Sequence, residues 1–501
     1  MFYPSRSKSD SVPQRDNVGD ISLLFHPPCT PSCEMIITMS QKDLTQGRVS
    51  TSLARLTAPM MMGVSSSILV QTLEMGFIGQ LGTAYVAAIT FTFPLVMILT
   101  SIALGISIGT SSVIARSVGS KQYSNASGTN PVDANDVPRL GTHSLILVFL
   151  AMVVISALCW LAIDPLFLAM GAEPEMLPLI HSYLDIYLPG SVLFTTAMIC
   201  GSIMRANGSA IIPGIIMTVG SVINLILDPF LIFGWFGLPA MELAGAATAM
   251  TLTRFLTLVV TLWYVYHGSM VLTKNVFRGW LASTKRILHI GVPAIATNLI
   301  GPFTAAYITY LIADYGQDAV AGFGVAGRLE ALAAMLLFAL SGSIGPFVGQ
   351  NWGAHEFNRV RLGVNVSYLF SLSWGFLVAI PLFFFGEEIA GLIDAKPEVV
   401  KVAGIYLALV PWSYGLWGIL MMSSASFNAL GKPLPSTALS FARMIVVYVP
   451  LATLLNNLMG YVGIFIATLI SNALFGVVSW KWFSLRLANM TRLTKAQSIN
   501  T

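Results

Sequence analysis

The chain has 501 residues, of which 55% are hydrophobic and only 10% are charged, and its formal net charge is +4. Because an ordinary soluble domain is about 25% charged, this composition excludes a soluble globular protein and indicates a protein that lies in lipid. Strict period-two alternation of apolar residues is absent, which argues against a transmembrane β-barrel.

The first 50 residues are polar and rich in Pro and Ser, and we predict that residues 1–50 form a disordered cytoplasmic tail. Cys29 and Cys33 form a CxxxC pair in this tail without a His or Cys partner, so we expect no metal site there. The spacing of the four cysteines indicates no disulfide framework.

After the tail, long apolar runs are bounded by Gly, Pro and clusters of charge. A run such as LILVFLAMVVISALCWLAI at 145–163 exceeds the roughly 18 residues that cross a bilayer as a helix. The pattern predicts an all-α integral membrane protein with about twelve transmembrane helices. Their expected centres lie near residues 67, 100, 152, 192, 223, 256, 300, 333, 374, 414, 444 and 472.

The charged loops orient these helices. The connections between the expected helices are acidic on one side of the membrane, where Lys396 and Lys401 are the only basic residues. Because cytoplasmic loops carry the excess of Lys and Arg, we predict a multi-pass plasma-membrane protein with both termini in the cytoplasm. The basic residues on the other side are Arg55, Arg116, Lys121, Arg139, Arg205, Lys274, Arg278, Lys285, Arg286, Arg359, Arg361, Lys432, Lys481, Arg486, Arg492 and Lys495.

The chain also repeats itself at long range. The segment LTAPMMMG resembles HIGVPAIA, and ARSVGSKQYS resembles GQNWGAHEFN, with their prolines and glycines 234 residues apart. Two later matches are 222 and 223 residues apart, because the first half carries a polar insertion at 124–138. The matched residues are Pro59 with Pro293, Gly119 with Gly353, Pro189 with Pro411, and Gly208 with Gly431.

This repeat predicts two six-helix lobes, at 51–270 and 287–485, joined by a cytoplasmic linker at 271–286 and followed by a cytoplasmic tail at 486–501. Because six is even, both lobes enter the bilayer from the same side, and a pseudo-two-fold axis along the membrane normal relates the two bundles. Two lobes that rock around a central cavity are typical of transport by alternating access.

An aspartate lies inside the apolar fifth span, in NLILDP. Asn224 and Asp228 are one helical turn apart and share a face, so both can point at one ion or proton. Pro229 has no backbone N–H, which leaves the carbonyl of Leu225 without its helical partner and kinks the span. An unpaired carboxylate in hydrocarbon costs at least about 2.5 kcal/mol, and a proton or a bound cation relieves that cost. The alternative is that Asp228 caps a helix that ends at Pro229.

Two residues on neighbouring spans lie at nearly the same depth as Asp228. Glu74 on the first span and Thr248 on the sixth are each roughly 7 to 8 Å below the outer surface, and Asp228 is roughly 9 Å below it. We therefore predict a cation-coupling site of these residues with Asn224. Two alternatives remain open: Glu74 is an interfacial residue, or Arg254, deeper on the sixth span, pairs with one of the acids as a static ion pair.

The second lobe carries fewer polar residues within its spans. Glu330 and Arg328 lie two residues apart on the eighth span and so do not face each other on a helix. Glu330 is a candidate cavity residue, with structural pairing to a neighbouring helix as the alternative. Arg254 and Arg328 are further candidates for the cavity.

No motif points to catalysis or to ATP hydrolysis. The chain lacks HExxH, GxSxG and a Walker A run, and its six histidines are isolated. We expect no enzyme activity, no cofactor, no metal beyond a coupling Na⁺, and no nucleic-acid partner.

Several motifs together resemble the multidrug and toxic compound extrusion (MATE) family, in its prokaryotic branch. They are LEMGFIGQLG on the first span, RSVGSKQ after the second, NLILDPFLIFG on the fifth and GQNWGAHEFNRVR after the eighth. The resemblance implies export of cationic, amphiphilic organic compounds in exchange for inward Na⁺ or H⁺, by a functional monomer in contact with membrane lipid. It implies a coupling site at Glu74, Asn224, Asp228 and Thr248, where the family usually has aspartate in place of Glu74.

A runner-up function is a flippase for lipid-linked oligosaccharides, because the same superfamily contains such proteins. A groove lined by several arginines would suit a phosphate-bearing lipid, and Arg254, Arg328 and Arg443 keep this reading open. An intramembrane enzyme or a channel is a third reading, which lacks a nucleophile cluster or a pore-lining ring.

Overall fold

The computed structural model describes residues 43–127, 135–237 and 239–499, with the backbone alone at 493–499. Cys29 and Cys33, and most of the predicted tail, lie outside the described residues. The part of the tail at 43–48 differs from the expectation, because it packs against the second lobe. Leu44 is buried, and its backbone N–H donates to Oε1 of Gln350 at 3.3 Å.

Twelve stretches of the described chain are long and apolar enough to cross a membrane, and each expected centre falls within one of them. The first lobe contains α2 (Val49–Leu81), α3 (Thr83–Ser127), α4 (Asp136–Leu161), α5 (Ile163–Ala169), η2 (Pro174–Met176), α6 (Leu177–Ala206), α7 (Ile211–Phe233), η3 (Trp235–Gly237) and α8 (Glu242–His267). The second lobe contains α9 (Trp280–Ala313), α10 (Gln317–Gly353), α11 (Phe357–Gly391), α12 (Pro397–Leu409), η4 (Val410–Ser413), α13 (Tyr414–Ala429), α14 (Pro433–Phe441), η5 (Ala442–Tyr448), α15 (Val449–Met459) and α16 (Tyr461–Ile499).

The two spans that are irregular both belong to the second lobe. The tenth consists of α12 and α13 joined by η4, where Pro411 removes a helical hydrogen-bond donor. The eleventh runs from α14 through η5, a π-helical segment, into α15. Because π-helical turns within helices concentrate at functional sites, η5 is a place to look for function in this lobe.

The helices of each lobe pack in the same way, as the sequence repeat predicts. A Cβ on Gly214 of α7 would lie 2.5 Å from the carbonyl oxygen of Pro59 on α2. At the matching place in the second lobe, the hydroxyl of Thr437 on α14 donates to the carbonyl of Pro293 on α9 at 3.1 Å. The same backbone oxygen therefore receives the neighbouring helix in both halves.

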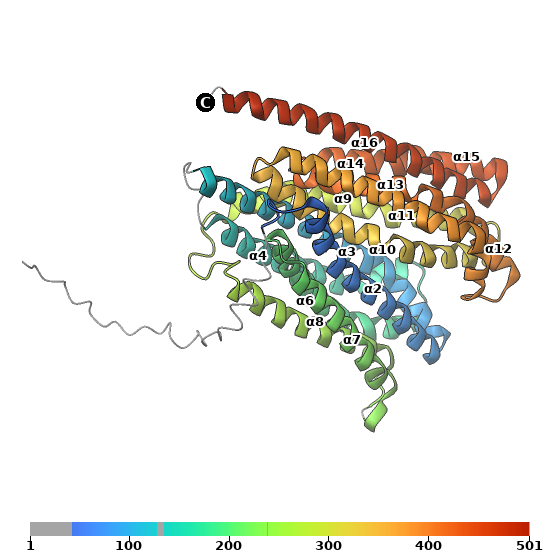
Figure 1. The fold of residues 1–501 in the computed structure, drawn as a ribbon. Coiled ribbons are helices and arrows are strands. Elements are labelled where there is room, and N and C mark those ends of the chain that lie inside the picture. Colours follow the sequence, from blue (N-terminus) through green and yellow to red (C-terminus); the bar gives the residue numbers. More distant parts are fainter. Residues whose placement is uncertain (1–42, 128–134, 238, 500–501) are drawn as a thin grey trace, which may run out of the picture.

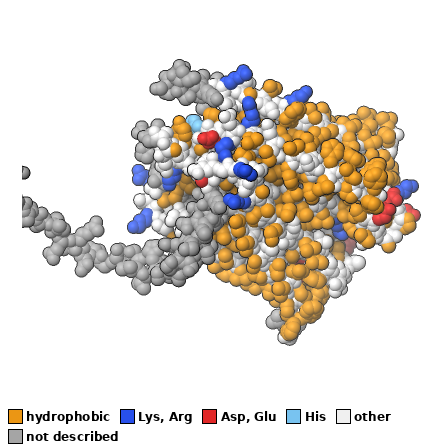
Figure 2. Space-filling view, in the orientation of Figure 1, with side chains coloured by type: hydrophobic (Ala, Val, Ile, Leu, Met, Phe, Trp, Pro, Cys, Tyr) orange, Lys and Arg blue, Asp and Glu red, His pale blue; other side chains and the backbone are white. Residues whose placement is uncertain are grey.

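We call the side at which α2 begins and α16 ends the terminal face, and the opposite side the distal face (Figure 1). Hydrophobic side chains cover the flank of the molecule, as a surface in contact with lipid requires (Figure 2). Most of the Lys and Arg side chains visible in Figure 2 gather toward the terminal face.

The lobes meet mainly through α2 and α3 of the first and α9 and α10 of the second. Near the terminal face, the Ser112 hydroxyl of α3 donates to the carbonyl of Asn428 at 2.5 Å, and Nε2 of Gln350 donates to the carbonyl of Ala206 at 2.8 Å. Arg286 of α9 contacts Asp136 of α4 at 3.3 Å in the same region. The terminal face is therefore closed by contacts between the two lobes.

Candidate functional site

The polar pair on the fifth span forms a direct hydrogen bond inside the first lobe. Asp228 is fully buried, and its Oδ2 accepts a hydrogen bond of 2.9 Å from Nδ2 of Asn224. Its other oxygen, Oδ1, is buried without a hydrogen-bond partner. Because a buried carboxylate oxygen with no partner is costly, this atom is the least satisfied acceptor of the pair and the natural place for a cation or a proton.

The helix that carries Asp228 does not end there. α7 continues through Pro229 to Phe233 and is closed by Gly234 in a left-handed conformation, with φ of 73°. Asp228 is therefore an interior residue of the helix, and the alternative that it caps an early end does not hold. Pro229 kinks the span as expected of a proline inside a helix.

Glu74 joins the pair from the first span. α2 packs against α7, and Glu74 is buried, with 7% of its surface exposed. Its carboxylate interacts electrostatically with Asp228 and with Arg254. The buried position argues against the alternative of an interfacial glutamate, and two acids from different helices share one region of the lobe.

The ends of the helices place the predicted residues at a common depth. Glu74 is seven residues before the distal end of α2, Asp228 is five before that of α7, and Thr248 is six after the start of α8. At 1.5 Å per residue these are roughly 8 to 10 Å from the distal ends of the helices. The Thr248 hydroxyl donates to the carbonyl of Ala244 on its own helix at 2.7 Å, so only its lone pairs remain to act as a ligand.

Arg254 takes a different place from the one expected of an ion-pair partner. Its guanidinium lies 4.7 Å from the ring centre of Tyr187 and 5.0 Å from that of Phe194, both on α6. Its Nη1 is buried without a hydrogen-bond partner. Among the described side chains, no ion pair joins Arg254 to Glu74 or Asp228. The static ion pair is therefore not formed, and aromatic rings hold this cation instead.

Two tyrosines belong to the site that the sequence analysis did not single out. Tyr183 and Tyr187 are buried on α6 with their rings stacked 5.4 Å apart. Tyr183 interacts electrostatically with Glu74, Asp228 and Arg254. Their spacing of four residues in the fourth span was a usable signal, because it puts both rings on one helix face.

The second lobe holds a separate polar cluster around Glu330. The Glu330 carboxylate on α10 accepts hydrogen bonds from the hydroxyls of Tyr406 and, at 3.3 Å, Tyr414. It lines a cavity of about 170 Å³, together with Arg443 of η5. Glu330 is thus both a cavity residue and paired with neighbouring helices, so the two readings of the sequence coexist.

Arg443 and Arg328 differ in their surroundings. Nη1 of Arg443 donates to Oδ1 of Asn472 at 2.5 Å, while its Nε is buried without a partner. Arg328 is exposed, and it is not among the residues that line the cavity. Because Arg254 lies in the other lobe, these three arginines do not form the shared groove on which the flippase alternative depends.

The polar clusters of the two lobes are not copies of each other. With the repeat spacings of 234 and 223 residues, Glu74 and Asp228 correspond to Ile308 and Leu451 in the second lobe. Likewise, Glu330 corresponds to Val96 in the first lobe. Among the described residues, no group of three or more His, Cys, Asp and Glu side chains that could hold a metal ion occurs in either lobe.

Comparison with known proteins decides the family. The MatE family profile matches residues 59–230 and 293–454, one segment in each lobe. The chain belongs to the MATE family of transporters. Membership in a transporter family, with no enzyme among its defining members, agrees with the lack of a catalytic motif in the sequence.

This MATE transporter is similar over most of its length to characterised bacterial proteins. It is 32% identical over 455 residues to the FAD transporter of Shewanella oneidensis, covering 90% of this chain and 97% of that one. It is 26% identical over 423 residues to the multidrug export protein MepA of Staphylococcus aureus, covering 83% and 89%. The crystal structure of the Vibrio cholerae MATE transporter VcmN in the bent form superposes with a TM-score of 0.81 at 28% identity, covering 88% of this chain and 97% of that one.

Proposed function

We propose that this MATE transporter is a secondary antiporter that exports cationic, amphiphilic organic compounds in exchange for Na⁺ or H⁺. The observation that carries the proposal is the Asp228 carboxylate, which is fully buried with Oδ2 bound to Asn224 and Oδ1 without a partner. A buried carboxylate in this condition takes up a proton or a cation. Uptake from one side and release to the other then provide the driving force.

Glu74 and Tyr183 define how the charge at this site is controlled. Two carboxylates close together disfavour simultaneous ionisation, so Glu74 strengthens the demand of Asp228 for a single neutralising cation or proton. Arg254 supplies opposing positive charge from α8, although it does not bind either carboxylate directly. In the proposal, Thr248 adds the lone pairs of its hydroxyl as a ligand from the facing helix α8.

The two lobes supply the movement that coupling needs. Their described contacts close the terminal face, which we propose faces the cytoplasm, because the Lys and Arg residues gather there. In this orientation Asp228, within roughly 8 Å of the distal end of its helix, exchanges its ion with the outside. We propose that a single chain in the plasma membrane performs the whole cycle, because each chain contains both lobes.

The boundary between the lobes suits bulky apolar substrates. Sδ of Met335 on α10 accepts from the Ser65 hydroxyl of α2 at 3.1 Å, and Sδ of Met60 lies 3.5 Å from the Ser343 hydroxyl. Thioether side chains are flexible and polarisable, and they adapt to ligands of different shape. Methionines at this boundary therefore support export of several related compounds.

A second candidate substrate class is an anionic dinucleotide such as FAD. The relative in Shewanella oneidensis carries that name. In this chain the observation that favours it is Arg254, whose guanidinium lies against Tyr187 and Phe194 and keeps Nη1 without a partner. An arginine presented on aromatic rings is suited to bind a phosphate and an adjoining flat ring system.

Export from cells separates the two substrate classes. In cells that express the protein, we expect lower ethidium accumulation than in cells without it, and Asp228→Asn restores high accumulation. Arg254→Gln is expected to leave ethidium export unchanged if cations are the substrate. If Arg254→Gln instead abolishes secretion of FAD while ethidium is never exported, the anionic class replaces the cationic one.

A further inference from the structure

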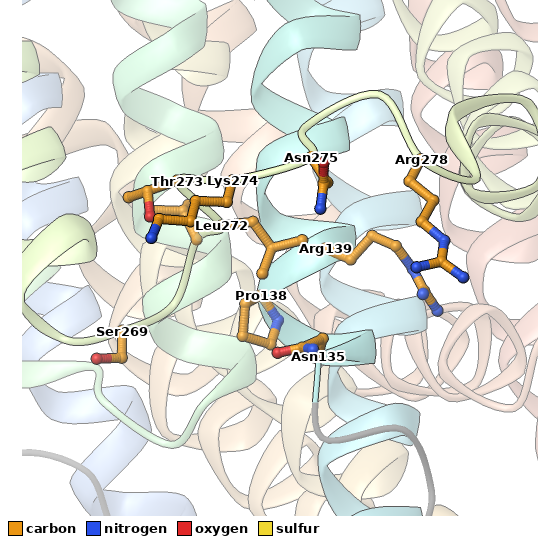
Figure 3. A pocket seen from close by; sticks show the side chains of 10 residues that line it. Asn135, Pro138, Arg139, Ser269, Leu272, Thr273, Lys274, Asn275 and Arg278 are labelled. Atoms are coloured by element: carbon orange, nitrogen blue, oxygen red, sulfur yellow. The ribbon is translucent and has the colours of Figure 1, made fainter. Parts of the chain in front are cut away.

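The largest pocket described in the molecule lies away from the coupling site, at the terminal face. It has a volume of about 680 Å³ and lies between the start of α4 and the segment 268–279, which connects the two lobes (Figure 3). None of the residues that line it is acidic. They are Asn135, Pro138, Arg139, Ser269, Val271, Leu272, Thr273, Lys274, Asn275 and Arg278.

The connecting segment is held firmly against α4, so the pocket is formed in advance. The Thr142 hydroxyl accepts a hydrogen bond of 2.7 Å from the backbone N–H of Leu272, and Nε2 of His143 lies 2.8 Å from the carbonyl oxygen of Val276. Asn275 has a φ of 55°, which a non-glycine residue adopts at a cost of about 1 kcal/mol or more. A segment this well anchored spends little free energy on becoming ordered around a ligand.

Positive charge dominates the pocket and its border. Arg139, Lys274 and Arg278 line it, and in Figure 3 Arg139 and Arg278 extend toward the same side. The nearby acid, Asp136, already accepts from Arg139 at 2.8 Å, from Arg286 at 3.3 Å and from Ser117 at 2.8 Å. The basic side chains therefore outnumber the carboxylate that neutralises them, which favours an anion.

Exposed apolar side chains stand beside these charges. Phe277 and Leu281 have 69% and 79% of their surface exposed, and they flank Arg278 in the chain. The pocket lies at the membrane face where the Lys and Arg residues gather (Figure 2). A charged pocket bordered by exposed apolar residues matches a phospholipid, whose headgroup is anionic and whose acyl chains are apolar.

We propose that this pocket binds the phosphate group of an anionic phospholipid in the adjacent leaflet. Arg139, Lys274 and Arg278 hold the phosphate, and Phe277 and Leu281 contact the acyl chains. The proposal rests on the orientation proposed above, which places the pocket in the cytoplasmic leaflet, but not on the identity of the transported substrate or ion. Since the segment 268–279 joins the lobes, a lipid bound here touches the connection that must bend when they move.

Native mass spectrometry of the full-length protein in mild detergent tests the proposal. Phosphatidylglycerol is added to the parent protein and to Lys274→Gln/Arg278→Gln, with phosphatidylcholine as the zwitterionic comparison. The matched control is Arg361→Gln/Lys481→Gln, which removes the same two charges from exposed positions on α11 and α16. We expect retention of phosphatidylglycerol to fall about tenfold or more in the pocket variant, since each basic residue near the surface contributes to binding, and to stay unchanged in the control.

Two further arms distinguish a lipid from free phosphate. We expect Phe277→Ser/Leu281→Ser to weaken phosphatidylglycerol retention, and inorganic phosphate at millimolar concentration to leave it unchanged. Displacement of the lipid by inorganic phosphate would overturn the lipid as ligand, as would full retention by the apolar variant. Equal loss in the pocket variant and the control would also overturn the proposal, because it would show a diffuse surface attraction. Unchanged thermal unfolding midpoints of all variants establish that they fold.

Discussion

Gly119 of α3 and Gly353 of α10 lie at the closest backbone contact between the two lobes. A Cβ on Gly119 would lie 2.0 Å from the carbonyl oxygen of Gln350, and one on Gly353 would lie 2.2 Å from that of Arg116. The two residues are partners in the sequence repeat, so each lobe contributes one glycine to a nearly symmetric contact. Because the contact lies at the terminal face, it helps to close that side of the transporter.

We predict that Gly353→Ala shifts the protein toward the state in which the terminal face is open. The added methyl group meets the backbone of α3, which cannot move without separating the lobes. A reporter cysteine in place of Ser112, in a chain without its native cysteines, measures the opening by its rate of reaction with a maleimide. We expect this rate to rise about tenfold, which corresponds to about 1.4 kcal/mol of destabilisation.

Gly345→Ala is the matched control for this experiment. Gly345 is on the same helix, and a Cβ there meets nothing within 4 Å. The reporter should therefore react at the parental rate. Equal rates in Gly353→Ala and the parent would contradict the role of the glycine contact in closing the terminal face.

The Glu330 cluster leads to a prediction about stability. Tyr406→Phe removes one of the two tyrosine hydroxyls that donate to Glu330 while keeping the ring. Because a buried carboxylate then lacks part of its hydrogen bonding, we expect the free energy of unfolding to fall by about 1 to 3 kcal/mol. Tyr310→Phe, at a position with 68% of its surface exposed, should have little effect. A loss of the same size in both variants would mean that the Glu330 contact contributes nothing specific.

Thr248 distinguishes the two coupling ions. Its hydroxyl donates to Ala244 and keeps its lone pairs free to bind a cation, whereas a proton on Asp228 has no need of it. If Na⁺ is the ion, we expect Thr248→Ala to weaken Na⁺-driven exchange about tenfold, the effect of losing one hydrogen-bond-strength ligand, and Thr248→Ser to preserve it. A loss in Thr248→Ser as large as that in Thr248→Ala would contradict the ligand role.

Much of the architecture could be predicted from the chain itself, for physical reasons. Bilayer thickness fixes the length of an apolar run, and every expected helix centre lies in a span. The repeat identified Gly208 and Gly431, which both adopt a left-handed conformation, with φ of 88° and 75°, at the ends of α6 and α13. A position that needs glycine in both lobes leaves a mark in the sequence.

Side-chain pairing across helices was less predictable. The i and i+4 relation of Asn224 and Asp228 is local, and the structure shows their hydrogen bond. The arrangement of Arg254 against Tyr187 and Phe194 depends on how α8 packs on α6, and no spacing within one helix reveals that. The π-helical segment η5 that carries Arg443 likewise has no period that an apolar run displays.

Exchange in proteoliposomes with separately imposed Na⁺ and pH gradients tests the central claim, that Asp228 couples the ion to the substrate. We predict that the parent accumulates or expels substrate in response to one of the gradients and that Asp228→Asn responds to neither. Asp185→Asn is the matched control, because Asp185 lies on a span but is half-exposed and bound to Trp160; it should respond as the parent does. Gradient-driven transport by Asp228→Asn at the parental rate would contradict the account.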